Sequence, residues 1–212
     1  AGTSDTTLTV TVHGADDAPT ITSGSSGSIA ENASTATAIY TVAATDVDSG
    51  DTKTFSLKAG VGDVALLNID ASSGAVTLKT AADYETKNSY TFTVVATDAA
   101  GLTDEKAVTV AVTNVNEAPT AVADTVLATE KGGTANAVAG VDPTGNVLSN
   151  DTDVDANASL SVYAVAGSTT NVGQTVVGSH GNVVINSDGS YSYLVNNNDS
   201  AVQALGVGQS IT

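Results

Sequence analysis

The stretch Tyr90-Thr-Phe-Thr-Val94 alternates large apolar side chains with threonine, one residue at a time. Because successive side chains of an extended chain point to opposite faces, this period of two predicts a β-strand with one buried face. The same alternation occurs in residues 108–112 and, near the start of the chain, in residues 7–12. Strands with one buried face are typical of antiparallel sheets, so these runs predict an antiparallel β protein.

The C-terminal part carries the pattern of a β-hairpin. Two strand-like runs, residues 182–186 and 190–194, flank Ser187-Asp-Gly189. A short connection that contains glycine between two such runs predicts a hairpin, in which Asp188 hydrogen-bonds its own turn. No segment has a convincing helical period, and we expect an all-β chain of tandem β-sandwiches.

Charge and composition exclude several classes of function. The 212 residues hold 23 Asp and Glu but only six Lys and Arg, for a formal net charge of -17. Nucleic acid is an unsuitable partner, since binding phosphates requires cations, and an anionic membrane surface is disfavoured for the same reason. The absence of cysteine excludes disulfides and thiolate metal sites. No run approaches the roughly 18 apolar residues of a membrane span, so direct membrane insertion is not expected.

Two sequence echoes divide the chain into repeats. His13-Gly-Ala-Asp-Asp-Ala-Pro-Thr20 matches Asn114-Val-Asn-Glu-Ala-Pro-Thr120, and Thr45-Asp-Val-Asp48 matches Thr152-Asp-Val-Asp155. The two prolines are 100 residues apart, the length of a small β-sandwich. We therefore expect the closing strand of a preceding repeat at 1–14, one whole sandwich at 15–118 and an incomplete sandwich at 119–212, whose exposed edge invites pairing with another chain.

The acidic residues gather in short clusters at predicted strand ends and linkers. Calcium takes six to eight oxygen ligands, so its sites need several carboxylates and carbonyls from different segments. A turn is the competing interpretation of each cluster. For Asp46 and Asp48, spacing on an extended segment favours a face with two carboxylates, and Asp83-Tyr-Glu85 has the same spacing. The clusters are Asp16 with Asp17, Glu31 with Asn32, Asp46 with Asp48 and Asp51, Asp83 with Glu85, Asp98, Asn114 with Asn116 and Glu117, and Asp151 with Asp153 and Asp155.

Taken together, residues 15–119 resemble a cadherin repeat. The resemblance rests on Glu31-Asn32, Thr45-Asp-Val-Asp48, Asp83-Tyr-Glu85, Ala96-Thr-Asp-Ala-Ala-Gly101 and Asn114-Val-Asn-Glu-Ala-Pro119. It implies Ca²⁺ at both ends of the module. One junction would use Asp16, Asp17, Asp46, Asp48 and Asp98. The other would use Glu31, Asp83, Glu85, Asn114, Asn116, Glu117, Asp153 and Asp155, and because its linker holds fewer aspartates it is expected to bind more weakly.

The region after Pro119 resembles the VCBS-type repeats of very long surface proteins from Vibrio, Colwellia, Bradyrhizobium and Shewanella. The matching residues are 145–155, Asp188-Gly-Ser-Tyr-Ser-Tyr193 and 201–205, and residues 4–14 resemble the closing strand of the same repeat type. The resemblance implies a secreted or cell-surface bacterial adhesin, active in cell adhesion, biofilm or surface attachment. Its expected partners are neighbouring repeats of the same chain, and glycans or like modules on other cells.

Other functions find less support in the sequence. Asp151-Thr-Asp-Val-Asp-Ala-Asn157 begins like an EF-hand loop, but Ala156 replaces the required glycine and Val162 the required glutamate. No nucleophile, base and orienting group can be assembled, and His13 and His180 are isolated in the sequence, so an enzyme is not expected. A calcium-dependent carbohydrate-binding module stays open as the alternative, with Tyr40 and Tyr163 as the aromatic residues least explained by a core.

Overall fold

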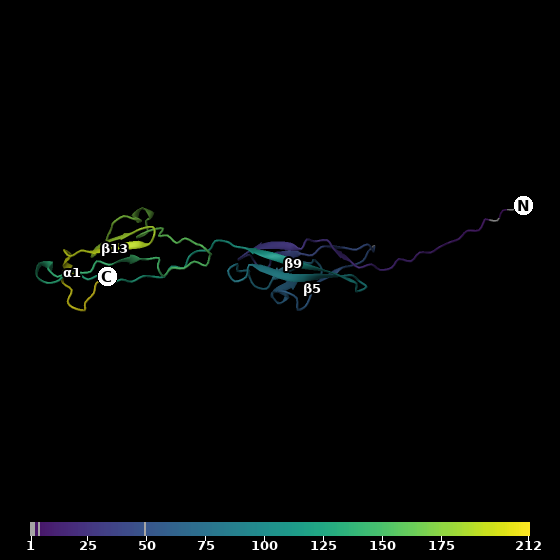
Figure 1. Cartoon of the computed structure of the whole chain (residues 1–212), viewed down its shortest axis with the longest axis horizontal. Helices are drawn as coiled ribbons and strands as arrows, with labels where there is room; N and C mark the ends of the chain where they lie inside the picture. The colour runs from purple at the N-terminus through teal and green to yellow at the C-terminus, as the bar shows by residue number, and fades with distance from the viewer. Residues whose placement is uncertain (1–2, 4, 49) are drawn as a thin grey trace. The chain divides into compact units, whose positions relative to one another are not determined.

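The computed structural model describes residues 3, 5–48 and 50–212. The chain divides into two compact units, residues 1–115 and 116–212, called here the N-terminal unit and the C-terminal unit. Figure 1 shows strands as the main element of both. The all-β fold class predicted from the sequence is confirmed.

Two sheets face each other in the N-terminal unit. A four-stranded sheet has the order β2-β9-β8-β5, and a three-stranded sheet has the order β3-β7-β6. One pair departs from the expected antiparallel pattern, because β2 runs parallel to β9. A short antiparallel pair, β1 with β4, lies beside them. The strands are β1 Thr20–Ile21, β2 Ser26–Ala30, β3 Ala38–Thr41, β4 Ala44–Thr45, β5 Thr54–Leu57, β6 Leu67–Ile69, β7 Ala75–Leu78, β8 Ser89–Thr97 and β9 Thr103–Thr113.

The core of this unit comes from the alternation that the sequence displays. In β8 every second side chain from Tyr90 to Ala96 is buried, and in β9 Val108, Val110 and Val112 are buried. Phe92 meets Tyr40 of the other sheet edge-on, with ring centroids 6.0 Å apart. The sandwich is thus held by apolar contacts between the inner faces of two sheets.

The expected strand over residues 7–12 has no ladder in the structure. Strand assignment begins at Thr20 within the described residues, and Leu8, Val10 and Val12 are 87%, 71% and 86% exposed. The apolar and polar side chains of this segment do alternate, but the segment pairs with no sheet of the N-terminal unit. That it closes a preceding repeat stays a prediction.

The C-terminal unit contains one four-stranded sheet. Its order is β10-β13-β12-β11, and the predicted hairpin is present as β12 paired antiparallel with β13. Residues 120–141 contribute only isolated bridges, such as Thr129 with Val141. The elements are β10 Thr144–Asn146, β11 Val176–Val177, β12 Gly181–Ile185, β13 Ser190–Val195 and the helix α1 Ser200–Gln203.

The helical elements are short. Besides α1, the structure has three-residue 3₁₀ turns at Val64–Leu66, Thr134–Asn136 and Thr169–Asn171. None of the helices in the described part of the chain is long and apolar enough to cross a membrane.

Candidate metal centre

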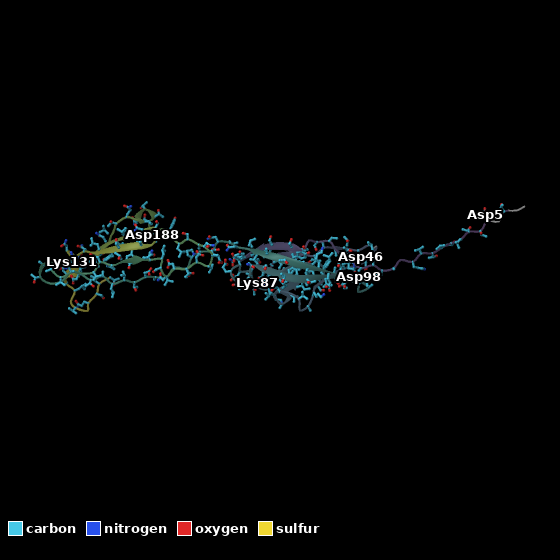
Figure 2. The ribbon with its side chains drawn as sticks, viewed as in Figure 1. Asp5, Asp46, Lys87, Asp98, Lys131 and Asp188 are labelled. Atoms are coloured by element: carbon cyan, nitrogen blue, oxygen red, sulfur yellow. The ribbon has the colours of Figure 1, made fainter. Side chains whose placement is uncertain are left out.

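Three aspartates converge at one end of the N-terminal unit. Asp98 follows the end of β8, Asp46 follows β4, and Asp51 lies in the connection that leads to β5. One carboxylate oxygen from each lies within 4.8 Å of the others. Figure 2 labels Asp46 and Asp98 next to each other at this end of the sandwich. These three residues are called the aspartate cluster below.

Each member of the aspartate cluster holds one oxygen in a turn and leaves the other without a partner. The Oδ1 atoms accept backbone N–H groups at 2.8 to 3.0 Å, from Leu102 for Asp98, Asp48 for Asp46 and Thr52 for Asp51. The three Oδ2 atoms are buried and have no hydrogen-bond partner among the described residues.

Buried polar atoms normally have a hydrogen-bond partner, and leaving a charged one unpaired costs at least about 1 to 3 kcal/mol. Three such oxygens, on aspartates from two loops whose carboxylates lie within 4.8 Å of one another, are therefore unusual in a protein interior. A hard divalent cation would satisfy all three at once, because calcium prefers carboxylate and carbonyl oxygens. The residues of the aspartate cluster thus fit a calcium ion.

Three further acidic residues surround the aspartate cluster. The backbone N–H of Asp17 donates to Oδ2 of Asp48 at 2.8 Å, which ties the segment before Pro19 to this end of the unit. The pKa of Asp16 is raised above its ordinary value, first by partial loss of solvent and then by the negative charges of Asp98, Asp51, Asp48 and Asp46. Carboxylates that repel one another in this way favour a bound cation. The structure therefore brings together the residues expected at the first junction.

Asp51 was seen in the sequence as part of an acidic run but was not chosen as a ligand. It enters the cluster through a turn, in which its backbone N–H donates to the carbonyl of Asp48 at 3.3 Å. The expected spacing of side chains on an extended segment did not predict the position of Asp51, because Asp46-Val-Asp48 forms a bend and not an extended strand. The sequence feature that could have pointed to Asp51 is the high density of aspartates in the six residues 46–51.

A second acidic group lies elsewhere in the N-terminal unit, around the buried carboxylate of Glu31. Glu31 is 3% exposed, and its two oxygens accept the backbone N–H groups of Tyr84 at 2.8 Å and Val115 at 2.6 Å. One oxygen of Glu85 lies within 4.8 Å of it, and Glu85 also accepts a hydrogen bond from the Asn114 amide at 3.0 Å. Glu31 therefore already organises the backbone at this end.

Asp83 differs from the expectation for that group. Its Oδ1 and Oδ2 atoms accept the backbone N–H and the hydroxyl of Thr86, each at 2.9 Å, and these bonds lower the pKa of Asp83. Residues 84–86 form a turn, so the prediction that Asp83 and Glu85 share the face of an extended segment is wrong. Asp83 acts here as a turn acceptor.

The C-terminal unit repeats the local geometry of the first junction. The backbone N–H of Glu117 donates to Oδ2 of Asp155 at 2.7 Å, and the N–H of Asp155 donates to Oδ1 of Asp153 at 3.0 Å. Asp17, Asp48 and Asp46 are joined by the same two bonds. The turn that follows is also equivalent, because the N–H of Ala158 donates to the carbonyl of Asp155 at 3.2 Å. Ala158, without a carboxylate, therefore stands in the position of Asp51. Close by in the sequence, the amide of Asn116 donates to the carbonyl of Glu117 at 2.9 Å.

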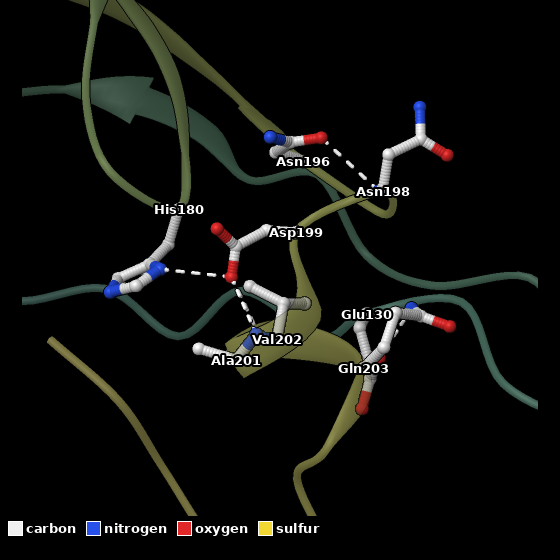
Figure 3. Close-up of polar contacts among 8 residues, drawn as sticks. All are labelled: Glu130, His180, Asn196, Asn198, Asp199, Ala201, Val202 and Gln203. Carbon is white, nitrogen blue, oxygen red and sulfur yellow. Dashed lines mark hydrogen bonds and ion pairs between the residues drawn. The ribbon is translucent and has the colours of Figure 1, made fainter.

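Two expectations about other polar and aromatic residues change. His180 is not isolated, because its Nδ1 lies 3.4 Å from Oδ1 of Asp199, which also accepts the N–H groups of Ala201 and Val202 at the start of α1 (Figure 3). Tyr40 is buried and donates its hydroxyl to Gly24, so it offers no surface for a sugar. Asp188 does accept its own turn, from the N–H and hydroxyl of Ser190, as expected.

Comparison with known proteins finds a family match in each unit. Residues 25–113 match the cadherin domain, and residues 116–210 match the bacterial cadherin-like domain. Each match covers less than half of the chain. Cadherin-like domains suggest an adhesion or extender module outside the cell rather than an enzyme. No curated protein in the comparison matches the chain.

One solved structure supports the same fold, and a second is reported for its sequence identity. Drosophila N-cadherin EC1–4 is similar at a TM-score of 0.52 and 19% identity, covering 87% of this chain and 42% of its own. Protocadherin gamma B7, described as an EC3–6 cis-dimer, is similar at 27% identity and a TM-score of 0.45, covering 53% of this chain and 29% of its own. The chain thus spans less than half of either structure.

Proposed function

We propose that this chain is a calcium-rigidified extender or adhesion segment of a large extracellular repeat protein at a bacterial cell surface. The observation that carries the proposal is the set of three buried, unpartnered carboxylate oxygens of the aspartate cluster. In this proposal calcium binds Asp46, Asp51 and Asp98, with Asp16, Asp17 and Asp48 completing the site. The ion fixes the segment before Pro19 against the first sandwich, so that successive repeats are held as a stalk that presents adhesive modules for surface attachment or biofilm formation.

The acidic group around Glu31 and Glu85 is proposed as a weaker site. Both oxygens of Glu31 accept backbone N–H groups, and Glu85 accepts a hydrogen bond from the neutral amide of Asn114. Fewer free negative charges favour calcium less. That Asn116, Glu117, Asp153 and Asp155 contribute to this site, and that the C-terminal unit is a VCBS-type repeat, stay predictions.

Calorimetric titration with calcium tests the proposal directly. Extracellular calcium modules bind with dissociation constants of about 10⁻⁴ to 10⁻³ M. We expect the whole chain to bind in this range and Asp46→Asn to lose the tightest binding step. Asp124→Asn is the matched control, because it removes the same charge from an exposed residue outside the aspartate cluster. Binding that is absent, or that is equally strong in Asp46→Asn, would refute calcium at this site.

Small-angle scattering tests the rigidifying role separately. A chelator should increase the spread of conformations about the residues before Pro19, and calcium should narrow it. The Asp46→Asn variant should behave like the chelated wild type at every calcium concentration. Calcium binding without a change in scattering would leave the ion in place but contradict the extender role.

A further inference from the structure

The strand β1, Thr20–Ile21, leads from the segment before Pro19 into the first sandwich. Among the described residues it pairs with β4, Ala44–Thr45, in a sheet of two strands. A ladder of two residue pairs is marginally stable, because two strands alone bury little apolar surface and must still be ordered. The β1–β4 pair therefore needs further contacts to keep one position on the sandwich.

Two charged side chains of β9 bind the edge of β1 that faces away from β4. The N–H of Thr22 donates to the carbonyl of Ala43, so the polar groups of the preceding residue, Ile21, point to the opposite side. There the N–H of Ile21 donates to Oδ2 of Asp104 at 2.7 Å, and its carbonyl accepts Nζ of Lys106 at 2.9 Å. Asp104 and Lys106 thus take the place of a neighbouring strand, and they are called the β1 clamp below.

The β1 clamp joins the β1–β4 pair to the four-stranded sheet. Asp104 and Lys106 stand on the inward face of β9, in the same alternation as the buried Val108 and Val110. The ammonium of Lys106 also donates to the carbonyl of Ser23 at 2.7 Å. Hydrogen bonds of charged groups are stronger than those of neutral groups, and both side chains are partly buried, where water competes less. The three bonds therefore fix β1 against β9.

The segments that the β1 clamp joins also carry the aspartate cluster. β4 ends one residue before Asp46, and β8 ends one residue before Asp98. β9, which supplies the clamp, pairs with β8 along the whole length of β8. The position of the β1–β4 pair on β9 therefore sets the separation of Asp46 and Asp98, whose carboxylates lie within 4.8 Å of each other.

We propose that Asp104 and Lys106 are positioning residues for the calcium ion of the aspartate cluster. They do not contact the ion, but they hold β1 and β4 against β9, so that Asp46 and Asp98 face one ion. The proposal rests on the calcium function proposed above and adds two residues on which the affinity of that site depends. Replacement of residues one step removed from a metal weakens its binding about 10- to 100-fold.

Charge alone would have the opposite effect at Lys106. Its ammonium is positive, so replacement by methionine makes this end of the unit more negative and, by Coulomb attraction, would strengthen the binding of a cation. Loss of positioning weakens binding instead, because the carboxylates no longer converge. The direction of the change therefore separates a positioning role from an electrostatic one.

Calorimetric titration of the whole chain with calcium tests the proposal. We expect the tightest binding step of Lys106→Met to be about 10- to 100-fold weaker than that of the wild type. Lys106→Arg keeps a charged donor and should recover most of the affinity. Lys79→Met is the matched control, because Nζ of Lys79 also donates to a backbone carbonyl, that of Ala65 at 2.7 Å, and its affinity should not fall.

Asp104→Ala provides an independent variant of the β1 clamp. It removes a negative charge, which by itself weakens calcium binding slightly, so it needs its own control. Glu105→Ala removes the same charge from the next residue, whose exposed side chain stands on the outward face of β9. We expect Asp104→Ala to weaken calcium binding clearly more than Glu105→Ala does.

Hydrogen exchange in chelator follows the clamp without calcium. The amide of Ile21 should exchange faster in Asp104→Ala than in the wild type, whereas the amide of Val94, in the centre of β8, should stay protected and report that the unit is folded. Unchanged exchange of Ile21 would overturn the proposal. Calcium binding by Lys106→Met that equals or exceeds that of the wild type would overturn it and leave the calcium function intact. A wild type that binds no calcium would refute the calcium function and the positioning role together.

Discussion

Replacement of Asp98 by asparagine should change the stability of the chain in opposite directions with and without calcium. Asp98 is 6% exposed, and its Oδ2 is one of the three unpartnered oxygens. The substitution keeps the size of the side chain and its Oδ1 acceptor for Leu102, but it removes one charge from the aspartate cluster. The experiment thus separates a metal ligand from a structural turn residue.

The size of the calcium effect follows from mass action. With a dissociation constant of about 10⁻⁴ M, 10 mM calcium stabilises the folded unit by about 2.7 kcal/mol. Loss of even an indirect contact to a metal weakens binding about 10- to 100-fold, so the hundredfold case leaves only about 0.4 kcal/mol. For a unit of this size, each kcal/mol shifts the melting temperature by about 4 to 8 °C. We therefore expect calcium to raise Tm by about 10 to 20 °C in the wild type and by about 2 to 3 °C in the variant.

Without calcium the variant should be the more stable protein. Two carboxylates 4.8 Å apart repel by about 0.9 kcal/mol even at the dielectric constant of water, and Asp98 faces two such neighbours. Asparagine removes both repulsions, so its Tm in chelator should exceed that of the wild type.

Differential scanning calorimetry of wild type, Asp98→Asn and the exposed control Asp124→Asn measures Tm both with calcium and with chelator. Equal calcium shifts in the wild type and Asp98→Asn, or a lower Tm of Asp98→Asn in chelator, would refute the role given to the aspartate cluster.

Further predictions concern the fold and the charge of the chain. Phe92→Ala should destabilise the N-terminal unit by about 3 to 5 kcal/mol in urea unfolding, because it empties the space against Tyr40 at the centre of the sandwich. Asp70 accepts four hydrogen bonds from Ser72 and Ser73, which lower its pKa to about 2. Its folded pKa lies below its unfolded value, so its contribution to stability is complete above about pH 4 and is lost as the pH falls through about 2. Asp70→Ala should therefore lower Tm by more at pH 7 than at pH 2. Glu31→Gln should cost about 1.5 to 3 kcal/mol of stability in chelator, measured by thermal unfolding, because one of two buried backbone N–H groups then meets an amide donor.

The strands that bury one face could be predicted from the sequence. Burial of one face requires apolar side chains at every second position, and this alternation is visible in the sequence. β8, β9 and the β12–β13 hairpin are of this kind. Residues 7–12 alternate in the same way. A strand also needs a neighbouring strand to pair with, and alternation does not indicate where that strand lies. The structure shows that this partner is not in the N-terminal unit's own sheets.

Site residues were predictable where the acidic pattern is long-range and less so where it depends on turns. Asp46 and Asp98 are 52 positions apart in the sequence, and the sandwich brings them together as expected. The surroundings of Asp51 and Asp83 were not predicted, because local turns place these residues and a period-of-two argument does not describe turns. Turn geometry therefore decides which carboxylates of an acidic run lie close together.

The two Asp-Val-Asp motifs show how charge is varied on a constant backbone. Both make the same pair of hydrogen bonds, one from the preceding linker and one within the motif, and both continue into the same turn. The first motif adds Asp51 from that turn and Asp98 from β8, whereas the second has Ala158 at the equivalent turn position. The same kind of hydrogen bond therefore joins the linker to each motif. The additional carboxylates supply two of the three unpartnered oxygens, beside that of Asp46, and these three oxygens make the first motif the stronger candidate for calcium.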